Sequence, residues 1–186
     1  RGSGQNYAHY RVDSDEASWD GDEPDSRELG HGLRSGGGYH ACPPLDRSAD
    51  LRAEACDILE RIGVPIRYHH HEVGAPGQSE IEPAMGPMLR MGDAIMLIKY
   101  VVRRVADRRG KSATFMPKPL HGEAGSGLHF HQHFFKGTEP VFYDAKGYAG
   151  LSKLALSYTA GLLTHGRSLL ALASASTNSY KRLVPG

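Results

Sequence analysis

The sequence has little of what marks several classes of protein. Its 186 residues include only two cysteines, which are too few for a disulfide framework. The net charge of +1 gives no electrostatic reason to expect nucleic acid or a membrane surface as a partner. No apolar run approaches the roughly 20 residues of a membrane-spanning helix, and the start, RGSGQNYAHY, has no signal-peptide pattern. We therefore expect a cytoplasmic protein that binds neither nucleic acid nor membrane.

Motifs of some common sites are also missing. The chain has no CxxC pair and no zinc-finger spacing, so a structural zinc site is not expected. It has no GxxxxGK[ST] loop, and its glycine-rich stretch lacks the strand–GxGxxG–helix context. These absences argue against a Walker-type nucleotide site and against a dinucleotide-binding fold.

Composition divides the chain in two. Residues 1–36 are polar, acidic and rich in glycine, and we expect an irregular surface segment there with one short strand near residues 7–12. Residues 37–186 have the patterns of a structured domain. The chain lacks an initiator Met and stops at KRLVPG, so we expect a domain that is incomplete at both ends.

Periodicity predicts a mixture of helices and strands. Helices are expected between Ser48 and Gly63, over 87–109 and over 147–166, and another begins near 168. Strands are expected over 64–73, 78–82, 127–135 and 140–144, with a short one near 111–115. Cys56 lies among apolar positions of the first helix, which indicates a buried free thiol. Mixed helices and hairpin-like strands favour an α+β or mixed α/β fold with antiparallel neighbours.

Histidines alternate with other residues in the stretch HFHQHF, directly after the glycine-rich GEAGSG. On a strand, every second residue lies on the same face. His129, His131 and His133 would therefore project to one side. The alternative is a polar strand face that is rich in histidine without a function.

The stretch YHHHEVGAPGQSE is typical of a hairpin that carries carboxylates. With the turn centred near Pro76, Glu72 and Glu80 would face each other, and His70 would share the face of Glu72. Cross-strand partners have Cβ atoms about 5 Å apart. Carboxylates this close repel unless a cation lies between them or one is protonated, and Mg²⁺ or Mn²⁺ prefers such oxygen ligands. A solvated hairpin with staggered carboxylates is the alternative.

A glycine-rich loop and three cationic side chains are further candidates for a functional site. The GEAGSG loop lets backbone N–H groups approach an anion closely. Lys118 lies between two prolines, and Lys181 and Arg182 lie in an expected polar loop, where they could hold a carboxylate or phosphate unless they are solvated surface residues. Divalent metal, cations and a glycine loop together suit phosphoryl transfer.

These residues resemble a known family. The motifs YHHHEVGAPGQSE, ATFMPKPLHGEAGSGLHFHQ, GYAGLS and NSYKRLVPG look like the central catalytic region of glutamine synthetase type I. The resemblance covers residues 37–186 and extends weakly into YRVDSDEASW, whereas residues 13–36 match poorly. It implies a ligase that joins glutamate and ammonia with ATP and two divalent metals, Mg²⁺ or Mn²⁺, through γ-glutamyl phosphate.

The resemblance also implies roles for metal ligands and for the acceptor site. Glu72 and Glu80 would bind one metal, and His129 would bind the other near the transferred phosphate. Arg182 would hold the glutamate carboxylate. Tyr39 would line the ammonium pocket together with Glu72.

The nucleotide and the backbone of glutamate have their own implied contacts. His131 would contact ATP phosphate, with His70 close by, and His133 lies on the nucleotide side. Gly125 would present its backbone to glutamate.

Three positions depart from the family's pattern. Ala124 stands where the family has Asn, at the place where the amino-acid end of glutamate is held. His133 stands where the family has Ser. Met85 stands in for the Phe that packs on adenine. The exact contacts to glutamate and nucleotide are expected to change accordingly.

By resemblance, the fold is a curved, largely antiparallel sheet wrapped by helices, in subunits assembled as a homo-oligomer of two stacked rings, a double-ring dodecamer. The family's remaining metal carboxylates and its flexible Glu loop lie outside these 186 residues, so we expect the piece alone to be inactive. Two alternatives stay open: a γ-glutamylamide ligase that uses an organic amine, and a non-catalytic structural relative.

Overall fold

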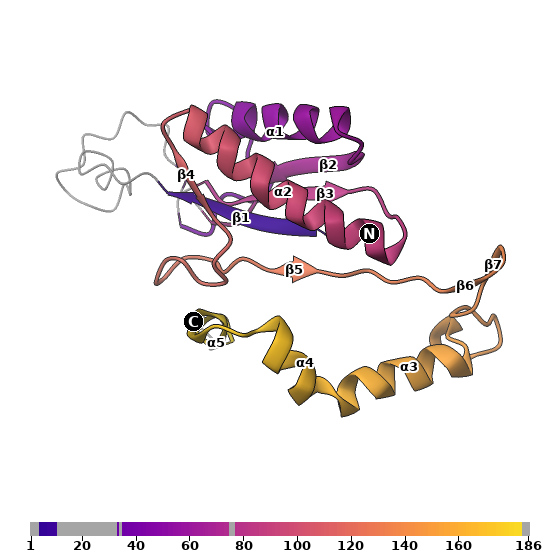
Figure 1. Ribbon diagram of the computed structural model, residues 1–186. Helices are drawn as coiled ribbons and strands as arrows, with labels where there is room; N and C mark the ends of the chain where they lie inside the picture. The colour runs from indigo at the N-terminus through magenta and orange to yellow at the C-terminus, as the bar shows by residue number, and fades with distance from the viewer. Residues whose placement is uncertain (1–3, 11–32, 34, 75–76, 184–186) are drawn as a thin grey trace.

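The computed structural model of the chain describes residues 4–10, 33, 35–74 and 77–183 (Figure 1). Its helices and strands are, in chain order, β1 Gly4–Tyr10, α1 Ala49–Arg61, β2 Ile66–His71, β3 Ser79–Pro83, α2 Met88–Arg108, β4 Ser112–Thr114, β5 Leu128–His129, β6 Phe135–Lys136, β7 Glu139–Pro140, η2 Tyr148–Gly150, α3 Lys153–Thr164, α4 Gly166–Ala173 and α5 Thr177–Arg182. The expected α+β class is confirmed. Along the described residues, no helix combines the length and the apolar character needed to cross a membrane.

The main sheet has the strand order β2-β3-β1-β4, and β5 pairs with β1 as well. Every pairing in it is antiparallel. β1 is therefore a central strand, although it comes from the segment that the composition marks as mostly irregular. The strand expected near residues 7–12 is present, a few residues earlier, and the acidic stretch that follows it lies outside the described residues.

Helices α1 and α2 cover one face of the sheet, as Figure 1 shows. Their apolar faces meet β3 in a core whose fully buried members include Leu51, Leu59, Ile81, Ile98 and Val102. Each such side chain contributes about 1.5–3 kcal/mol by leaving water. Cys56 belongs to this core as a free thiol, as expected, and burial raises its pKa to about 12.

Alternation along β3 separates the core from the site. Ile81 points into the core beneath the helices, with no exposed surface. Because neighbouring residues of a strand point to opposite faces, Glu80 and Glu82 lie on the face turned away from α1 and α2. The same rule places His70 of β2 on that face, since it pairs directly with Glu80. The helices thus cover one face of the hairpin and leave the opposite face, which carries His70 and Glu80, available for a functional site.

The apolar face of α2 is only partly buried. Its buried members lie from Ala94 onward, whereas Met88 is 90% exposed. At about 1.5 Å per residue, a helix of 21 residues outreaches the 13-residue α1 by about 12 Å. The first turns of α2 therefore extend past their packing partner.

The strand predicted over 127–135 is shorter than expected. Only Leu128–His129 forms β5, and β6 begins at Phe135. In the register of β5 on β1, His129 lies opposite Gly4, and residues 130–134 belong to no strand. The predicted strand face shared by three histidines is therefore not formed.

The C-terminal helices form an arm beyond the sheet (Figure 1). The helix predicted over 147–166 begins only at Lys153, where Ser152 caps it by accepting a hydrogen bond from the N–H of Ala155. Several leucines of α3 and α4 are exposed, among them Leu163 and Leu172. The chain then returns toward the sheet as α5, which places Arg182 in the last turn of a helix rather than in the predicted loop.

Candidate metal and substrate site

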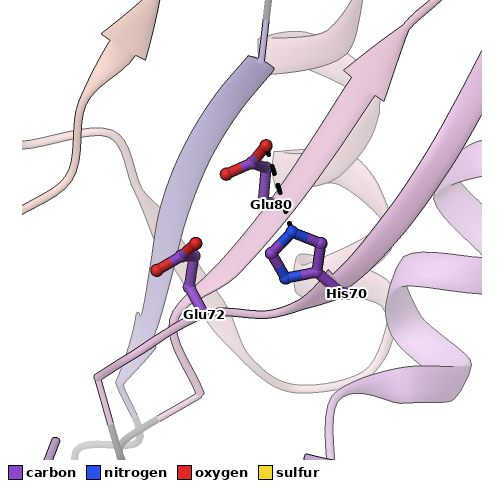
Figure 2. A group of neighbouring side chains, drawn as sticks. All are labelled: His70, Glu72 and Glu80. Atoms are coloured by element: carbon purple, nitrogen blue, oxygen red, sulfur yellow. Dashed lines mark ion pairs between the residues drawn. The ribbon is translucent and has the colours of Figure 1, made fainter. Parts of the chain in front are cut away.

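Three donor side chains converge on the open face of the β2–β3 hairpin, as Figure 2 shows. They are His70 from β2, Glu72 just after it and Glu80 from β3. One ligand atom of each lies within 4.8 Å of the others. The imidazole Nε2 of His70 lies 4.0 Å from Oε1 of Glu80, and the two side chains are only 9% and 13% exposed.

The hairpin register differs from the one predicted. Glu80 pairs with His70, and the backbone N–H of Glu72 donates to the carbonyl of Gln78, so Glu72 is displaced from Glu80 along the strand. The turn is closed between Gly74 and Gln78, whose N–H donates to the Gly74 carbonyl at 3.3 Å. This places the centre of the hairpin one residue before Pro76. The predicted direct pairing of the two glutamates is therefore wrong, but their shared face is confirmed.

The geometry fixes the tautomer of neutral His70. Its Nδ1 lies 2.9 Å from the carbonyl oxygen of His71. A carbonyl oxygen can only accept, so Nδ1 carries the proton and Nε2 keeps its lone pair. That lone pair belongs to the ring nitrogen nearest Glu80, which is the tautomer a metal-ligating histidine adopts.

Crowding of like charges marks Glu80. Burial raises its pKa above the ordinary value, the neighbouring Glu72 and Glu82 add to the rise, and His70 and His129 oppose it without cancelling it. A carboxylate in this state gains a large stabilisation from a nearby cation. His129 lies in β5, which pairs with β1, the strand next to β3.

Glu82 is a third carboxylate on this face that the sequence analysis missed. It is only 1% exposed, and it accepts a hydrogen bond of 2.9 Å from the guanidinium of Arg67. A register irregularity between Ile66 and Tyr68 accompanies this contact. Arg67 thus pairs with Glu82, and the described residues place no Lys or Arg side chain in an ion pair with Glu72 or Glu80.

The segment 37–41 packs against the end of β2. The N–H of Gly38 donates to the carbonyl of Val73, and that of His40 donates to the carbonyl of His71, both at 3.0 Å. A Cβ at Gly38 would lie 2.4 Å from the carbonyl oxygen of Glu72, which backbone atoms cannot tolerate. Glycine is therefore required where this segment crosses Glu72.

Aromatic rings hold His70 on two sides. The ring of His40 stacks on it with centroids 4.3 Å apart and 19° between the planes. Tyr39 meets its edge at 5.3 Å, and Tyr68 stacks more loosely at 5.9 Å. Tyr39 thus lies beside the donor group, as its expected role requires. His40 was not recognised from the sequence, because only the folded loop brings it onto His70.

The glycine loop lies against Arg182. A Cβ on Gly125 would come within 2.7 Å of Cγ of Arg182 and 2.8 Å of the carbonyl of Pro117. A Cβ on Gly127 would lie 2.8 Å from Nε2 of His129 and 3.1 Å from the guanidinium of Arg182. Both glycines are needed for these close approaches, which bring Arg182 and His129 together at the loop.

One side chain fastens α5 to the segment that leads into this loop. The amide of Asn178 accepts from the N–H of Lys118 at 2.7 Å and donates to the Lys118 carbonyl at 2.8 Å. The ammonium group of Lys118 donates to the backbone carbonyl of Glu123. Lys118 therefore closes its own loop, and Arg182 is the cation that the structure places beside Gly125 and Gly127.

The remaining predicted residues lie farther along the chain. His131 and His133 follow β5 and are exposed, and the ring of His133 stacks on Phe135 with centroids 6.4 Å apart. Neither belongs to the donor group of His70, Glu72 and Glu80. Met85 is half exposed, at 49%.

The donor group fits a hard divalent cation. Ligands about 2.1 Å from one Mg²⁺ lie about 3.0 Å apart when adjacent and about 4.2 Å apart when opposite. The observed spacing of up to 4.8 Å is within reach of small side-chain rotations. Two carboxylate oxygens and one imidazole nitrogen suit Mg²⁺ or Mn²⁺.

Comparisons with known proteins bear on this site. The family model described as glutamine synthetase, catalytic domain, matches residues 3–186. A glutamine synthetase of Streptomyces coelicolor is 48% identical over 183 residues, which are 98% of this chain and 39% of that protein. A 3-hydroxylaminophenol mutase of Cupriavidus pinatubonensis is 46% identical over 177 residues, which are 95% of this chain and 37% of that protein.

Structure comparison agrees. The cryo-EM structure of Plasmodium falciparum glutamine synthetase superposes with a TM-score of 0.86 and 26% identity, over 100% of this chain and 39% of that one. The chain thus spans about two fifths of the length of the relatives it matches.

Proposed function

We propose, since the chain belongs to the glutamine synthetase catalytic-domain family, that the full-length protein joins ammonia to glutamate in an ATP-dependent reaction. The reaction passes through γ-glutamyl phosphate. In this proposal the chain contributes the β2–β3 hairpin, the glycine loop and α5 to the active site.

The observation that carries the proposal is the donor group itself. His70, Glu72 and Glu80 lie within 4.8 Å of one another on a largely buried strand face. Two carboxylates held this close cost free energy in a protein that binds no cation. Their position near the loop that packs on Arg182 is what a reaction between a carboxylate and a phosphate requires.

The proposed ligands follow from this arrangement. Glu72 and Glu80 hold one Mg²⁺ or Mn²⁺, with Nε2 of His70 as the third donor, and His129 contributes to a second. Such cations, when bound, neutralise the charge on the phosphates of ATP. His131 and His133 contact the nucleotide from the exposed stretch that follows β5.

The chain's own residues position glutamate and move a proton. The guanidinium of Arg182 holds a carboxylate of glutamate, and the backbone at Gly125 supports the amino-acid end. The γ-carboxylate oxygen attacks the terminal phosphorus of ATP, and ADP leaves. Ammonium, held beside Tyr39, gives a proton to the carboxylate of Glu72. The resulting ammonia attacks the acyl carbon and the C–O bond to the phosphate breaks. The phosphate leaves with the bonding electrons and takes up the proton that the attacking nitrogen loses.

The proposal includes assembly and location. Exposed leucines on α3 and α4 support burial against further protein, in keeping with a homo-oligomer of two stacked rings. The proposed location is the cytoplasm, where glutamate, ammonium and ATP are available as substrates.

Phosphate release by the full-length protein tests the proposed reaction. With ATP, Mg²⁺ and glutamate, we expect release that depends on ammonium, and we expect Glu72→Ala to abolish it. Glu60→Ala, an exposed glutamate of α1 on the far side of the sheet, is the matched control and should keep wild-type activity. Turnover only with an organic amine would move the assignment to a γ-glutamylamide ligase, and absence of turnover with every acceptor would indicate a non-catalytic relative.

A second activity has a specific observation in its favour. The relative named 3-hydroxylaminophenol mutase is 46% identical to this chain, nearly as similar as the Streptomyces glutamine synthetase. A mutase rearranges its substrate without a second reactant. Consumption of 3-hydroxylaminophenol without ATP or glutamate would therefore establish this activity, independently of phosphate release.

A further inference from the structure

Gln78 is a buried polar side chain to which neither the sequence patterns nor the proposed reaction assigns a role. It is 1% exposed and lies where the β2–β3 turn re-enters the sheet. Its Oε1 accepts a hydrogen bond from the N–H of Gly74 at 2.9 Å, across the turn. Its backbone carbonyl accepts from the N–H of Glu72 at 2.8 Å. Gln78 is therefore fixed to the hairpin that carries Glu72 and Glu80.

The other end of the same amide reaches the glycine loop. Its Nε2 donates to the carbonyl of Gly125 at 3.0 Å and lies 3.3 Å from Oγ of Ser126. The N–H of Gly74 can only donate and the carbonyl of Gly125 can only accept, so the orientation of the amide is determined by its partners. One side chain thus joins two segments that are 47 residues apart in the sequence.

The link between Gln78 and Gly125 matters because Gly125 is itself packed against Arg182. Arg182 packs on Gly125 so closely that a Cβ there would meet its Cγ at 2.7 Å. Asn178, one turn earlier in α5, is bonded to the backbone of Lys118 at the start of the same loop. The glycine loop and Arg182 therefore form one packed unit, and Gln78 connects that unit to the hairpin.

We propose that Gln78 is a positioning residue that sets the distance between the donor group of His70, Glu72 and Glu80 and the unit formed by the glycine loop and Arg182. This inference rests on the proposed function, in which the first binds a divalent cation and the second binds glutamate. A misplacement of about 1 Å between such groups can cost on the order of a hundredfold in rate. A buried side-chain amide that is hydrogen-bonded at both ends is rigid enough to prevent such a misplacement.

The competing explanation is that Gln78 only closes the hairpin turn through Gly74. Two substitutions of similar length separate the two roles. Gln78→Glu keeps an oxygen that accepts from Gly74 but has no N–H to donate to Gly125. Gln78→Met keeps the length and loses both bonds. A positioning role predicts that both variants fail in the same way.

Calorimetry measures the binding of L-glutamate to the full-length protein at saturating Mn²⁺. The binding of Mn²⁺ is measured in a separate titration. Under the proposal, both variants bind glutamate on the order of tenfold to a hundredfold more weakly than the wild type. Gln78→Met binds Mn²⁺ as the wild type does, because its hairpin donors are intact. Glu60→Met and Glu60→Gln, at an exposed residue of α1 outside the proposed site, are the controls and keep both affinities.

Other outcomes overturn the inference in distinguishable ways. Weak glutamate binding by Gln78→Met alone would show that only the turn bond matters, and weak binding by Gln78→Glu alone would show an effect of the added charge. Loss of Mn²⁺ binding in Gln78→Met would show that the hairpin itself collapses. If either variant fails to fold, Gln78→Asn replaces it, because an amide one methylene shorter cannot span both partners. Absence of glutamate binding by the wild type would refute the proposed function and the inference with it.

Discussion

Glu80 lies directly opposite His70 across the β2–β3 ladder, with Nε2 of the imidazole 4.0 Å from Oε1 of the carboxylate. The proton of neutral His70 is held on the other ring nitrogen by the carbonyl of His71, so the nitrogen nearest Glu80 is free to donate its lone pair. With Glu72 displaced along the same face, the pair offers a cation one nitrogen and two oxygens.

Neutralising either glutamate should weaken cation binding strongly. Two unit charges about 4 Å apart interact by about 4 kcal/mol at an effective dielectric constant of about 20. We therefore expect Glu80→Gln and Glu72→Gln each to lower the Mn²⁺ affinity of the full-length protein by about 100-fold or more. Titration followed by electron paramagnetic resonance measures free Mn²⁺ directly. Glu60→Gln on α1 is the control, and equal affinities in all the variants would refute the cation site.

The ring of His40 should support Mn²⁺ binding by stacking on His70. It stacks on His70 at 4.3 Å, and an aromatic pair of this kind contributes about 0.5–1.5 kcal/mol. His40→Ala is expected to weaken Mn²⁺ binding about twofold to tenfold, because it frees the ring of His70. His40→Phe should restore the affinity. If phenylalanine fails as badly as alanine, stacking is not what His40 provides.

Gly125 should tolerate no side chain. A Cβ there would lie 2.7 Å from Cγ of Arg182 and 2.8 Å from the carbonyl of Pro117, and the backbone oxygen cannot move aside easily. We expect Gly125→Ala to displace Arg182 and to raise KM for glutamate about tenfold or more. Gly161→Ala in α3, where the added methyl group meets nothing within 4 Å, is the control and should leave kinetics unchanged. An unaltered KM in Gly125→Ala would contradict the proposed role of this loop.

The pair of Asp46 and Arg52 should make stability depend on pH. Burial alone would raise the pKa of Asp46, but hydrogen bonds and charge from Arg52, together with the N–H of Ser48, lower it below the ordinary value. The ionised carboxylate therefore stabilises the fold above its unfolded pKa of about 3.9, and this stability is lost as pH falls through the lower folded pKa.

Urea unfolding between about pH 6 and pH 2 measures this dependence. Asp46→Asn should destabilise the fold by about 3–5 kcal/mol at neutral pH, because it leaves Arg52, only 3% exposed, without its counter-charge. The decrease in the free energy of unfolding at acid pH that is due to Asp46 should be absent in this variant. Asp57→Asn, in an exposed ion pair with Arg61, should cost at most about 1 kcal/mol. A similar loss in the two variants would contradict the account of this buried pair.

Local patterns in the sequence predicted much of the fold. The helix that follows Ser48, the hairpin and the shared face of Glu72 and Glu80 depend on periodicity and alternation, which act over a few residues, although the hydroxyl of Ser48 makes no capping hydrogen bond. The hairpin register was wrong by two positions, because Gln78 closes the turn with Gly74 and its side chain is held by Gly125, far away in the sequence. The strand expected over 127–135 is also shorter than alternation predicted, because only Leu128–His129 pairs with β1.

The candidate site was predicted in part. The donor residues stood out as carboxylates and imidazoles near turns, and Arg182 as a candidate cation, while family resemblance added Tyr39. Gly38 and His40 were missed because their contacts exist only after the segment 37–41 folds over the end of β2. Glu82 was missed because its neutralisation by Arg67 depends on an irregularity in the register. Contacts of this kind are properties of tertiary structure.

The most direct test of the proposed reaction follows an oxygen atom. The full-length protein is given ATP, Mg²⁺, ammonium and glutamate labelled with ¹⁸O in its γ-carboxylate, and the released phosphate is analysed by mass spectrometry. If the carboxylate attacks the terminal phosphorus and ammonia then displaces phosphate from carbon, each phosphate carries one labelled oxygen. Phosphate without the label, or phosphate released equally well in the absence of glutamate, would contradict the account.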